Sequence, residues 1–229
     1  MKRFYTVAAA AQAEGGWQVT LDGRGVKSQA GKPQCVPSQR LADALAAEWA
    51  AQGEDIVPAS FLLRDMADYA IDVVAPDRAS AIAALLPYAE TDTLCYRADP
   101  AEALHRRQMV LWEPLLTQAE QRWDIAFTRI SGIIHQAQPA ATLARLALVL
   151  EAKDNFTLAA LRSLAGLSAS MIIGLAASEA GADAEVLWSA ANLEEDFQAE
   201  FWGQDAEAQA LRARRFRDFS AAMHFVSLL

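Results

Sequence analysis

Hydrophobic and polar positions alternate in short runs over the first forty residues. The strand-like pieces cover residues 3–7, 17–21, the neighbourhood of Val26, and 34–36. Turn-forming residues separate them, at Gly15-Gly16, Asp22-Gly23 and Gly31-Lys32-Pro33. Because Asp-Gly between two apolar runs is a hairpin signal, the pattern predicts a small antiparallel β unit.

A helical period replaces the alternation after Pro37. Ser38 is expected to cap a helix that continues toward Gly53, with Trp49 facing inward. A second helix is predicted from about Ser60 to Val74, and the following Ala-Pro ends it. We place a domain boundary there, which predicts a β-rich N-terminal domain with packed helices over residues 1–76 and a helical C-terminal domain over 77–229.

Beyond residue 76 the sequence is rich in alanine and leucine, and Pro, Gly, Ser, Thr and Asp punctuate it at intervals that suit helix ends. Helices are predicted over 77–86, 100–123, 139–153, 155–167, 170–180, 183–202 and 206–229. A run of β-branched and aromatic residues at 125–130 interrupts them. The expected fold class is α+β, mostly α: a small antiparallel β-containing N-terminal domain followed by a larger all-helical C-terminal domain.

The segment LEEDFQAEFWG, residues 193–203, places carboxylates among aromatic residues. In a helix over 183–202, successive residues are about 100° apart. One face is then apolar and contains Leu187, Ala190, Ala191, Phe197, Phe201 and Trp202. Glu194 and Gln198 lie along the middle of that face, where an ionised carboxylate needs a partner or a raised pKa.

Two interpretations of Glu194 are open. In the first, Glu194 is buried and structural, paired with an arginine such as Arg162 or capped by the N-terminus of another helix. In the second, Glu194 is a polar anchor within an apolar surface that contacts another protein. The sequence does not decide between an inward-facing and an outward-facing helix.

Composition and charge exclude several classes of partner. The 229 residues carry a net charge of −9, which is a poor match to a phosphate backbone. The uncharged segment 163–178 falls short of the roughly 20 apolar residues that a membrane-spanning helix needs. Cys35 and Cys95 are far apart and lack metal-ligand spacing, as is typical of a reducing compartment. We therefore expect no nucleic acid and no membrane insertion.

Metal-binding and catalytic motifs are incomplete in this sequence. Residues 102–105 have the Glu-x-x-His form found in di-iron bundles, but such a bundle needs that motif twice. The residues three positions before His135 and His224 are Gly132 and Ala221. We therefore predict no metal, no cofactor and no catalytic residue.

The segment PYAETDTLCYRAD, residues 87–99, is a second concentration of polar and aromatic side chains. A loop joining two domains, with buried tyrosine hydroxyls and an acid–arginine pair, explains this composition without chemistry. Loops also carry binding sites. The alternative function is therefore a small-molecule enzyme that uses residues 88–97 together with acidic residues such as Glu194.

Six motifs follow one another in a specific order and spacing. They are KRFY at residues 2–5, W-x-V-x-LDGR at 17–24, VPS at 36–38, LA-x-EW-x-x-Q ending at Gln52, YAETD-x-LCYRA at 88–98, and LEE-x-x-Q-x-E-x-WG at 193–203. The series resembles the ATP synthase assembly chaperones that act on the alpha subunit of the catalytic head, the ATPase assembly factor two type or ATP-twelve family. The resemblance runs over nearly the whole chain.

This resemblance implies a non-enzymatic chaperone, without a cofactor, that holds the free alpha subunit and prevents its aggregation until the beta subunit replaces it. The acid of the family's last motif maps to Glu194, and Glu195, Gln198 and Trp202 complete that motif. With Phe201, these are the predicted partner-binding residues. No transit-peptide-like leader precedes KRFY, so a bacterial, cytoplasmic member is expected. A scaffold without client selectivity would instead tolerate Glu194→Lys.

Overall fold

The computed structural model describes residues 1–132, 135–203 and 205–229, and these divide into two compact units. The first unit comprises Met1–Ala81, Asp154–Ala160 and His224–Leu229, and the second comprises Ile82–Lys153 and Leu161–Met223. The first unit therefore continues past Pro76 and includes two segments from much later in the chain. The division into an N-terminal domain over residues 1–76 and a C-terminal domain over 77–229 stays a prediction.

The N-terminal sheet is antiparallel, as the alternating pattern predicted. Its strands are β1 (Ala8–Ala13), β2 (Gly16–Leu21), β3 (Arg24–Gly25) and β4 (Cys35–Val36), and β2 pairs with each of the other three. Asp22 and Gly23 join β2 to β3, and both have positive φ angles, 47° and 81°. This left-handed geometry is the one that an Asp-Gly hairpin turn requires.

The strand predicted at residues 3–7 is wrong, because β1 begins at Ala8. Two backbone N–H groups of this segment, those of Thr6 and Val7, donate to the carboxylate of Asp22 at 2.8–3.1 Å. The real strand, AAAAQA, consists mainly of alanine, whose β propensity is low. The alternating pattern therefore placed the first strand at residues 3–7, directly before the strand that the structure shows.

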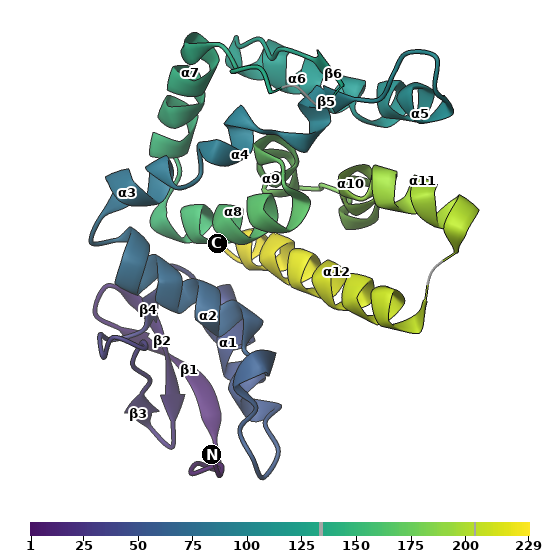
Figure 1. Ribbon diagram of the computed structural model, residues 1–229. Coiled ribbons are helices and arrows are strands. Elements are labelled where there is room, and N and C mark those ends of the chain that lie inside the picture. Colours follow the sequence, from purple (N-terminus) through teal and green to yellow (C-terminus); the bar gives the residue numbers. More distant parts are fainter. Residues whose placement is uncertain (133–134, 204) are drawn as a thin grey trace. The chain divides into compact units, whose positions relative to one another are not determined.

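Helix α1 (Gln39–Ala50) packs against the sheet in the first unit, and α2 (Leu62–Tyr69) packs against α1 (Figure 1). Helix α1 is capped by Ser38, whose side chain accepts a 3.0 Å hydrogen bond from Leu41 N, and Trp49 is buried, both as predicted. The carboxylate of Glu48 accepts the backbone N–H groups of Leu63 and Arg64 at 2.7 and 2.9 Å. It thereby satisfies the free donors at the start of α2, which continues as a π-helical segment, Ala70–Val74.

The second unit is built mainly from helices, and Figure 1 labels them in chain order. They are α4 (Pro87–Glu90), α5 (Ala103–Leu111), α6 (Glu113–Trp123), α7 (Ala140–Glu151), α9 (Met171–Ala177), α10 (Ala184–Ala191) and α11 (Leu193–Trp202). Helices α3 (Arg78–Ala83), α8 (Asn155–Ser168) and α12 (Ala206–Ser227) contribute residues to both units. A short parallel pair, β5 (Tyr96–Arg97) with β6 (Ile130–Ser131), accompanies the helices at the end of the β-branched run.

Two long helices expected from the sequence are each divided in the structure. The helix predicted over 100–123 ends at Leu111 and restarts at Glu113, next to Pro114, whose ring cannot continue a helical hydrogen-bond ladder. The helix predicted over 183–202 breaks at Asn192, which has φ −111° and ψ 17°. The side chain of Asn192 donates a 2.8 Å hydrogen bond to Trp188 O, which stabilises the break.

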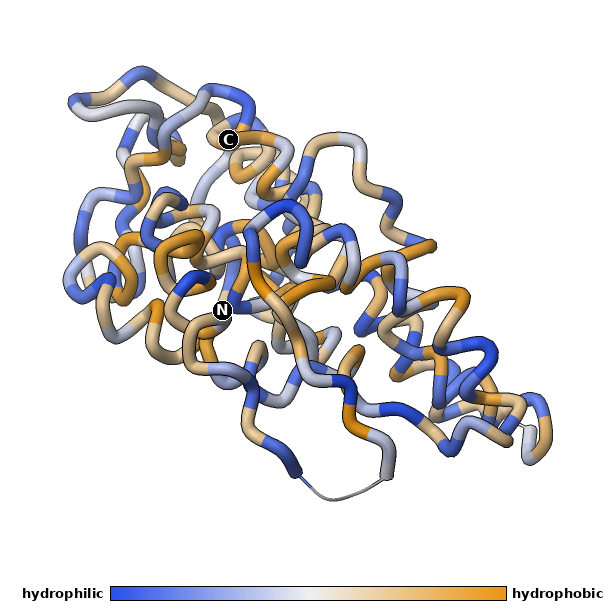
Figure 2. Tube along the Cα trace, turned by 90° about the horizontal axis from the view of Figure 1, so that it is seen from above, coloured by the Kyte–Doolittle hydropathy of each residue, from blue (hydrophilic) through white to orange (hydrophobic). Residues whose placement is uncertain are grey.

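Trp112, between α5 and α6 in the chain, is a fully buried residue of the second unit's hydrophobic core. Its indole N–H donates a 2.7 Å hydrogen bond to Ala190 O at the end of α10. Figure 2 shows hydrophobic and hydrophilic positions mixed along the helices, as expected for helices with one buried face. Among the described residues, no helix has both the length and the apolar character to cross a membrane.

Candidate functional site

Helices α5 and α11 are joined by a polar contact at Gln108. This side chain is completely buried; its Oε1 accepts the backbone N–H of Ala98 at 2.9 Å, and its Nε2 donates to Glu194 Oε1 at 2.8 Å. The partner of Glu194 is therefore a glutamine on α5. Arg162, the partner suggested from the sequence, instead donates to the hydroxyl of Tyr88 at 3.2 Å.

Glu194 lies at the edge of the protein interior and is half-buried. Burial raises the pKa of its carboxyl group because a charged carboxylate loses solvation, and the hydrogen bond from Gln108 opposes this shift. Glu194 is thus anchored on one side and accessible on the other. A glutamine thus takes the place of the arginine or helix N-terminus of the first interpretation, and contact of Glu194 with another protein stays a prediction.

A second contact between α5 and α11 is an ion pair at the surface. Arg107 makes two hydrogen bonds to the Glu200 carboxylate, one of them 2.7 Å from Nη2 to Oε2, and its guanidinium lies 5.0 Å from the ring centroid of Phe197. Phe197 in turn meets Phe201 edge-on, with ring centroids 5.1 Å apart. The ion pair and the aromatic contacts therefore hold the outer part of α11 against α5.

The predicted partner-binding residues lie on α11 with different exposures. Glu195 and Gln198 are exposed, Phe201 is 68% exposed and Trp202 is 87% exposed. The prediction of one continuous apolar face was wrong, because the break at Asn192 separates the buried face of α10 from the aromatic end of α11. Phe201 and Trp202 thus present large apolar groups to solvent, an arrangement that signals an interaction surface.

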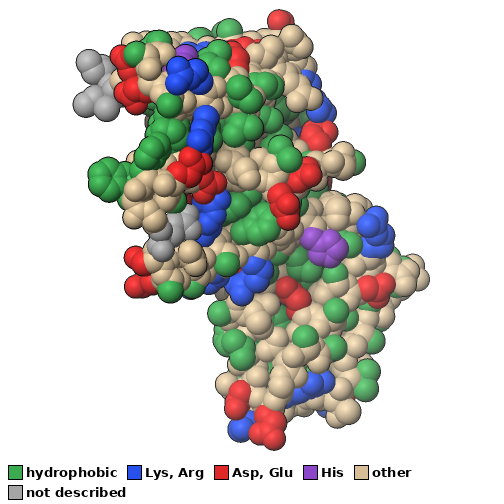
Figure 3. Space-filling view, turned by 90° about the vertical axis from the view of Figure 1, so that its right-hand side faces the viewer, with side chains coloured by type: hydrophobic (Ala, Val, Ile, Leu, Met, Phe, Trp, Pro, Cys, Tyr) green, Lys and Arg blue, Asp and Glu red, His purple; other side chains and the backbone are tan. Residues whose placement is uncertain are grey.

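Helix α5 adds exposed apolar residues that the sequence analysis missed. Met109, Val110 and Leu111 are 43%, 71% and 37% exposed. Three consecutive apolar residues cannot all face a core from one helix, and this was the signal available in the sequence. Figure 3, which views the molecule from the side of α5 and α11, shows hydrophobic side chains beside basic and acidic ones.

We call this region the α5–α11 surface. It consists of Met109, Val110, Leu111, Phe201 and Trp202 together with the polar side chains of Arg106, Arg107, Glu194, Glu195, Gln198 and Glu200. A hollow next to Val110 is lined by residues of α5 alone. The surface therefore combines apolar groups for contact with charged groups that can select a partner.

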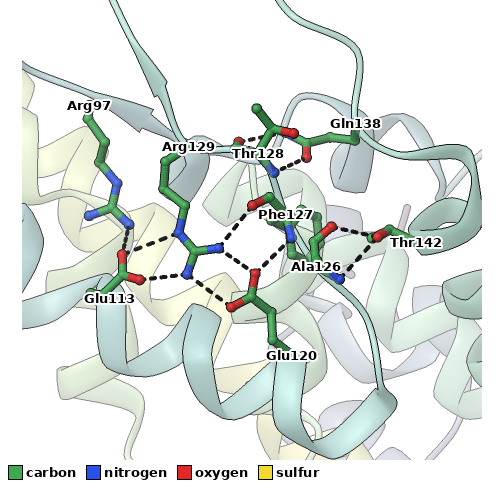
Figure 4. Close-up of polar contacts among 9 residues, drawn as sticks. All are labelled: Arg97, Glu113, Glu120, Ala126, Phe127, Thr128, Arg129, Gln138 and Thr142. Carbon is green, nitrogen blue, oxygen red and sulfur yellow. Dashed lines mark hydrogen bonds and ion pairs between the residues drawn. The ribbon is translucent and has the colours of Figure 1, made fainter.

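The segment 88–97, considered above as part of an enzyme site, uses its polar groups within the protein. Arg97 Nη2 donates to Glu113 Oε2 at 2.9 Å, and Glu113 also pairs with Arg129, which bridges to Glu120 (Figure 4). The two arginines lower the pKa of Glu113, with the hydrogen bond from Arg129 as the largest cause. Arg97 thus pairs with an acid outside the segment, and the resulting four-residue network ties β5 and β6 to α6.

Asp92, in the same segment, is completely buried. Its carboxylate accepts the backbone N–H of Leu94 at 3.0 Å and that of Ile172, at the start of α9, also at 3.0 Å. Burial raises the pKa of Asp92 to about 6, and these backbone hydrogen bonds oppose the shift. Asp92 therefore works as a cap that joins residues 88–97 to α9.

A cavity of about 290 Å³ lies between α6 and the α9–α10 connection. Its wall combines Leu115, Trp123 and Leu187 with the surface ion pair of Arg122 and Glu179, which is 3.0 Å long. No residue of segment 88–97 is part of this wall. Within residues 1–132, 135–203 and 205–229, no group of three or more His, Cys, Asp or Glu side chains could hold a metal ion.

Comparison with known proteins gives consistent matches. The family model described as "ATP12 chaperone protein" matches residues 2–120. The crystal structure of Atp12 from Paracoccus denitrificans matches with a TM-score of 0.91 and 36% identity, covering 99% of this chain and 97% of that chain, and a single-substitution mutant of it gives the same values. The Atu1473 protein of Agrobacterium tumefaciens, a candidate chaperone, has a TM-score of 0.93 and 37% identity, with coverages of 99% and 85%. The structural likeness thus covers nearly the whole chain, whereas the family model ends before α11.

Proposed function

Because this chain belongs to the ATP12 chaperone protein family, we propose that it assists the assembly of the F-type ATP synthase by binding the free alpha subunit of the catalytic head. In this proposal the chaperone prevents aggregation of the alpha subunit and releases it when the beta subunit docks. The chaperone class follows from the family. The client and the handover are our inference from the sequence motifs and from the α5–α11 surface.

The observation that carries the proposal is the exposure of Phe201 and Trp202 at the end of a helix that contacts α5. A side chain such as Trp202, 87% exposed, contributes little to the stability of this protein, since the apolar area it buries on folding is small. Large aromatic groups are the commonest energetic anchors of protein interfaces. Their presence at the end of a helix held in place by Arg107 and Gln108 supports a role in binding a protein client.

The chemistry of the client suits this surface. A subunit that belongs to a ring exposes its intersubunit face until its neighbour arrives, and exposed apolar surface of this kind causes aggregation. Val110, Phe201 and Trp202 could cover such a face. The charged groups around them would select one partner, because a mismatched surface would leave their hydrogen-bonding groups desolvated and unpaired.

The polar character of the surface also favours release. An interface made only of apolar groups would bind many partners and release them slowly. A polar rim weakens the complex between chaperone and client, so that a better-matched subunit can displace the chaperone. Glu195 and Gln198 are exposed beside the aromatic end of α11 and would form part of this rim. We therefore place the client contact on α5 and α11 together.

The test is an aggregation assay with purified alpha subunit. Isolated alpha subunit is diluted from denaturant with and without an equimolar amount of the chaperone, and light scattering is followed in the absence of ATP. We expect suppression of scattering and recovery of a soluble complex by gel filtration. Subsequent addition of the beta subunit should displace the chaperone from that complex.

Beta subunit alone and an unrelated aggregating protein serve as controls for selectivity. Equal protection of all three proteins would contradict the alpha-subunit proposal and favour a general holding activity. Absence of any complex with the alpha subunit would exclude the proposal altogether.

A further inference from the structure

A second candidate site lies in the first unit, in a hollow of about 540 Å³ beside the β2–β3 hairpin. Tyr5 and Trp49 line it and are themselves buried, with ring centroids 5.6 Å apart and nearly perpendicular planes. Phe4, which also lines it, is 65% exposed and packs edge-on against Tyr5 at 5.3 Å. The hollow therefore has an aromatic wall that continues onto the surface of the protein.

One buried polar group in this wall has no partner. Trp49 is 7% exposed, and its indole Nε1 is buried without a hydrogen-bond acceptor among the described residues. The neighbouring hydroxyl of Tyr5 is already engaged, since it donates a 2.6 Å hydrogen bond to Trp49 O. A buried N–H donor without an acceptor costs about 1–3 kcal/mol.

The same hollow is lined by two exposed cations, Arg24 and Lys27, and by one acid, Asp22. From Gly15 to Arg40 the chain carries four basic side chains and one acid, Asp22, although the whole protein has a net charge of −9. Asp22 is engaged by the backbone N–H groups of Thr6 and Val7, which are the main cause of its lowered pKa. In the part of the chain that the structure describes, no carboxylate pairs with Lys27.

We propose that this hollow binds an extended acidic segment of a protein partner. One large apolar side chain of the segment would rest against Phe4, Tyr5 and Trp49, and flanking carboxylates would lie next to Arg24 and Lys27. Ligand sites typically have volumes of about 300–1,000 Å³, so the hollow can hold one such side chain with its backbone. The exposed cations would contribute mainly to partner choice and association rate.

The aromatic wall and the small number of cations favour a peptide over nucleic acid. Nucleic acid binding depends on many phosphate contacts distributed along a basic face, whereas here two cations stand beside an apolar wall. The site goes beyond the proposed function, because its residues belong to the first unit and the α5–α11 surface belongs to the second. Either site can be present without the other.

The test uses the full-length protein and a library of short random peptides displayed on phage. Peptides selected on the wild-type protein should be enriched in Glu and Asp around one Phe, Trp or Leu. The strongest peptide is then labelled, and its affinity is measured by fluorescence anisotropy against Lys27→Glu, Phe4→Ala and the control Arg40→Glu. Arg40 is exposed on the same unit but does not line the hollow.

We expect roughly tenfold weaker binding for Lys27→Glu and for Phe4→Ala, and an unchanged affinity for Arg40→Glu. Replacing the glutamates of the peptide by glutamine should remove the difference between Lys27→Glu and the wild-type protein. Since Phe4 and Lys27 are exposed, the variants should unfold at the urea concentration of the wild-type protein, which circular dichroism checks.

Three results would overturn the proposal. Selected peptides without an acidic bias would exclude charge recognition. An equal loss of affinity in Lys27→Glu and Arg40→Glu would point to a general charge effect instead of a site. Capture of anionic lipid vesicles by the wild-type protein, lost in Lys27→Glu and without selection of any peptide, would assign these cations to a membrane surface.

Discussion

Gln108 Nε2 donates a 2.8 Å hydrogen bond to Glu194 Oε1 and so connects a fully buried side chain of α5 to a half-buried carboxylate of α11. The other end of the same amide accepts the backbone N–H of Ala98. One side chain thus connects three segments that are far apart in sequence. Together with the Arg107–Glu200 ion pair, this link holds α11 against α5.

We expect Gln108→Leu to lower the free energy of unfolding by about 2–4 kcal/mol, because both the Ala98 N–H and the Glu194 carboxylate lose their partner. Urea unfolding followed by circular dichroism measures this change. Gln121→Leu, which alters an exposed glutamine on α6, is the matched control and should shift stability by less than about 0.5 kcal/mol. Equal effects of the two substitutions would show that the Gln108 link is unimportant for stability.

The elements of the fold were largely predictable where local signals are strong. Ser38 caps α1, Asp22-Gly23 forms a hairpin turn, and Trp49 is buried, and the local sequence predicts each of these three features. The strand at Ala8–Ala13 was missed because alanine carries no strand signal. Its place in the sheet comes from pairing along the whole of β2, which is a tertiary effect.

The candidate site was predictable in composition but not in orientation. The motif at 193–203 indicated acids beside aromatic residues, yet the break at Asn192 redirects the chain, so that Leu187 is buried whereas Trp202 is exposed. No residue between 183 and 202 is a proline or glycine, so this segment contains neither of the usual helix-breaking residues at the break. The role of Gln108 depends on a contact between helices 86 residues apart, which a single sequence does not reveal.

A substitution of Glu194 distinguishes its charge from its hydrogen bond. Glu194→Gln keeps an oxygen that accepts from Gln108 and removes the charge. Because burial raises the pKa of Glu194, the folded state binds its proton more tightly than the unfolded state does, and stability declines as pH rises through this pKa. At pH 7 we therefore expect Glu194→Gln to be at least as stable as the wild-type protein in urea.

The same variant tests the role of the carboxylate in binding. We expect Glu194→Gln to protect the alpha subunit less well in the light-scattering assay, since a charged hydrogen bond is worth more than a neutral one. Full protection, with an unchanged affinity, would make Glu194 a structural residue alone.

The buried carboxylate of Asp92 should make stability depend on pH. Its pKa is raised from 3.8 to about 6, so the folded state holds the proton more tightly, and stability is lost as pH rises through this interval. Each pKa unit corresponds to about 1.4 kcal/mol, which gives an upper limit near 3 kcal/mol for this contribution. Relative to Asp92→Asn, the wild-type protein should therefore lose stability between pH 4 and pH 6 in urea titrations. Parallel pH profiles for the two proteins would show that Asp92 ionises normally.

The network around Arg129 should contribute far more to the free energy of unfolding than a surface ion pair does. Arg129 pairs with Glu113 and Glu120, whose side chains are 28% and 20% exposed. Arg129→Met leaves both carboxylates without this partner, and we expect a loss of about 3 kcal/mol in the free energy of unfolding. Arg122→Met breaks the more exposed pair with Glu179 and should cost less than about 1 kcal/mol. Similar losses for both variants would contradict a structural role for the network.

Trp202 gives the clearest separation between stability and function. It is 87% exposed, so Trp202→Ala should leave the urea midpoint unchanged while it weakens binding of the alpha subunit by about tenfold, as expected for an aromatic anchor. Leu148→Ala is the control, because Leu148 is 54% exposed on α7 and lies outside the α5–α11 surface. Surface plasmon resonance with immobilised alpha subunit measures both affinities. If Leu148→Ala weakens binding as much as Trp202→Ala does, or if neither has an effect, the client does not contact the end of α11. A loss restricted to Trp202→Ala, with stability intact, would assign that aromatic side chain to the client interface.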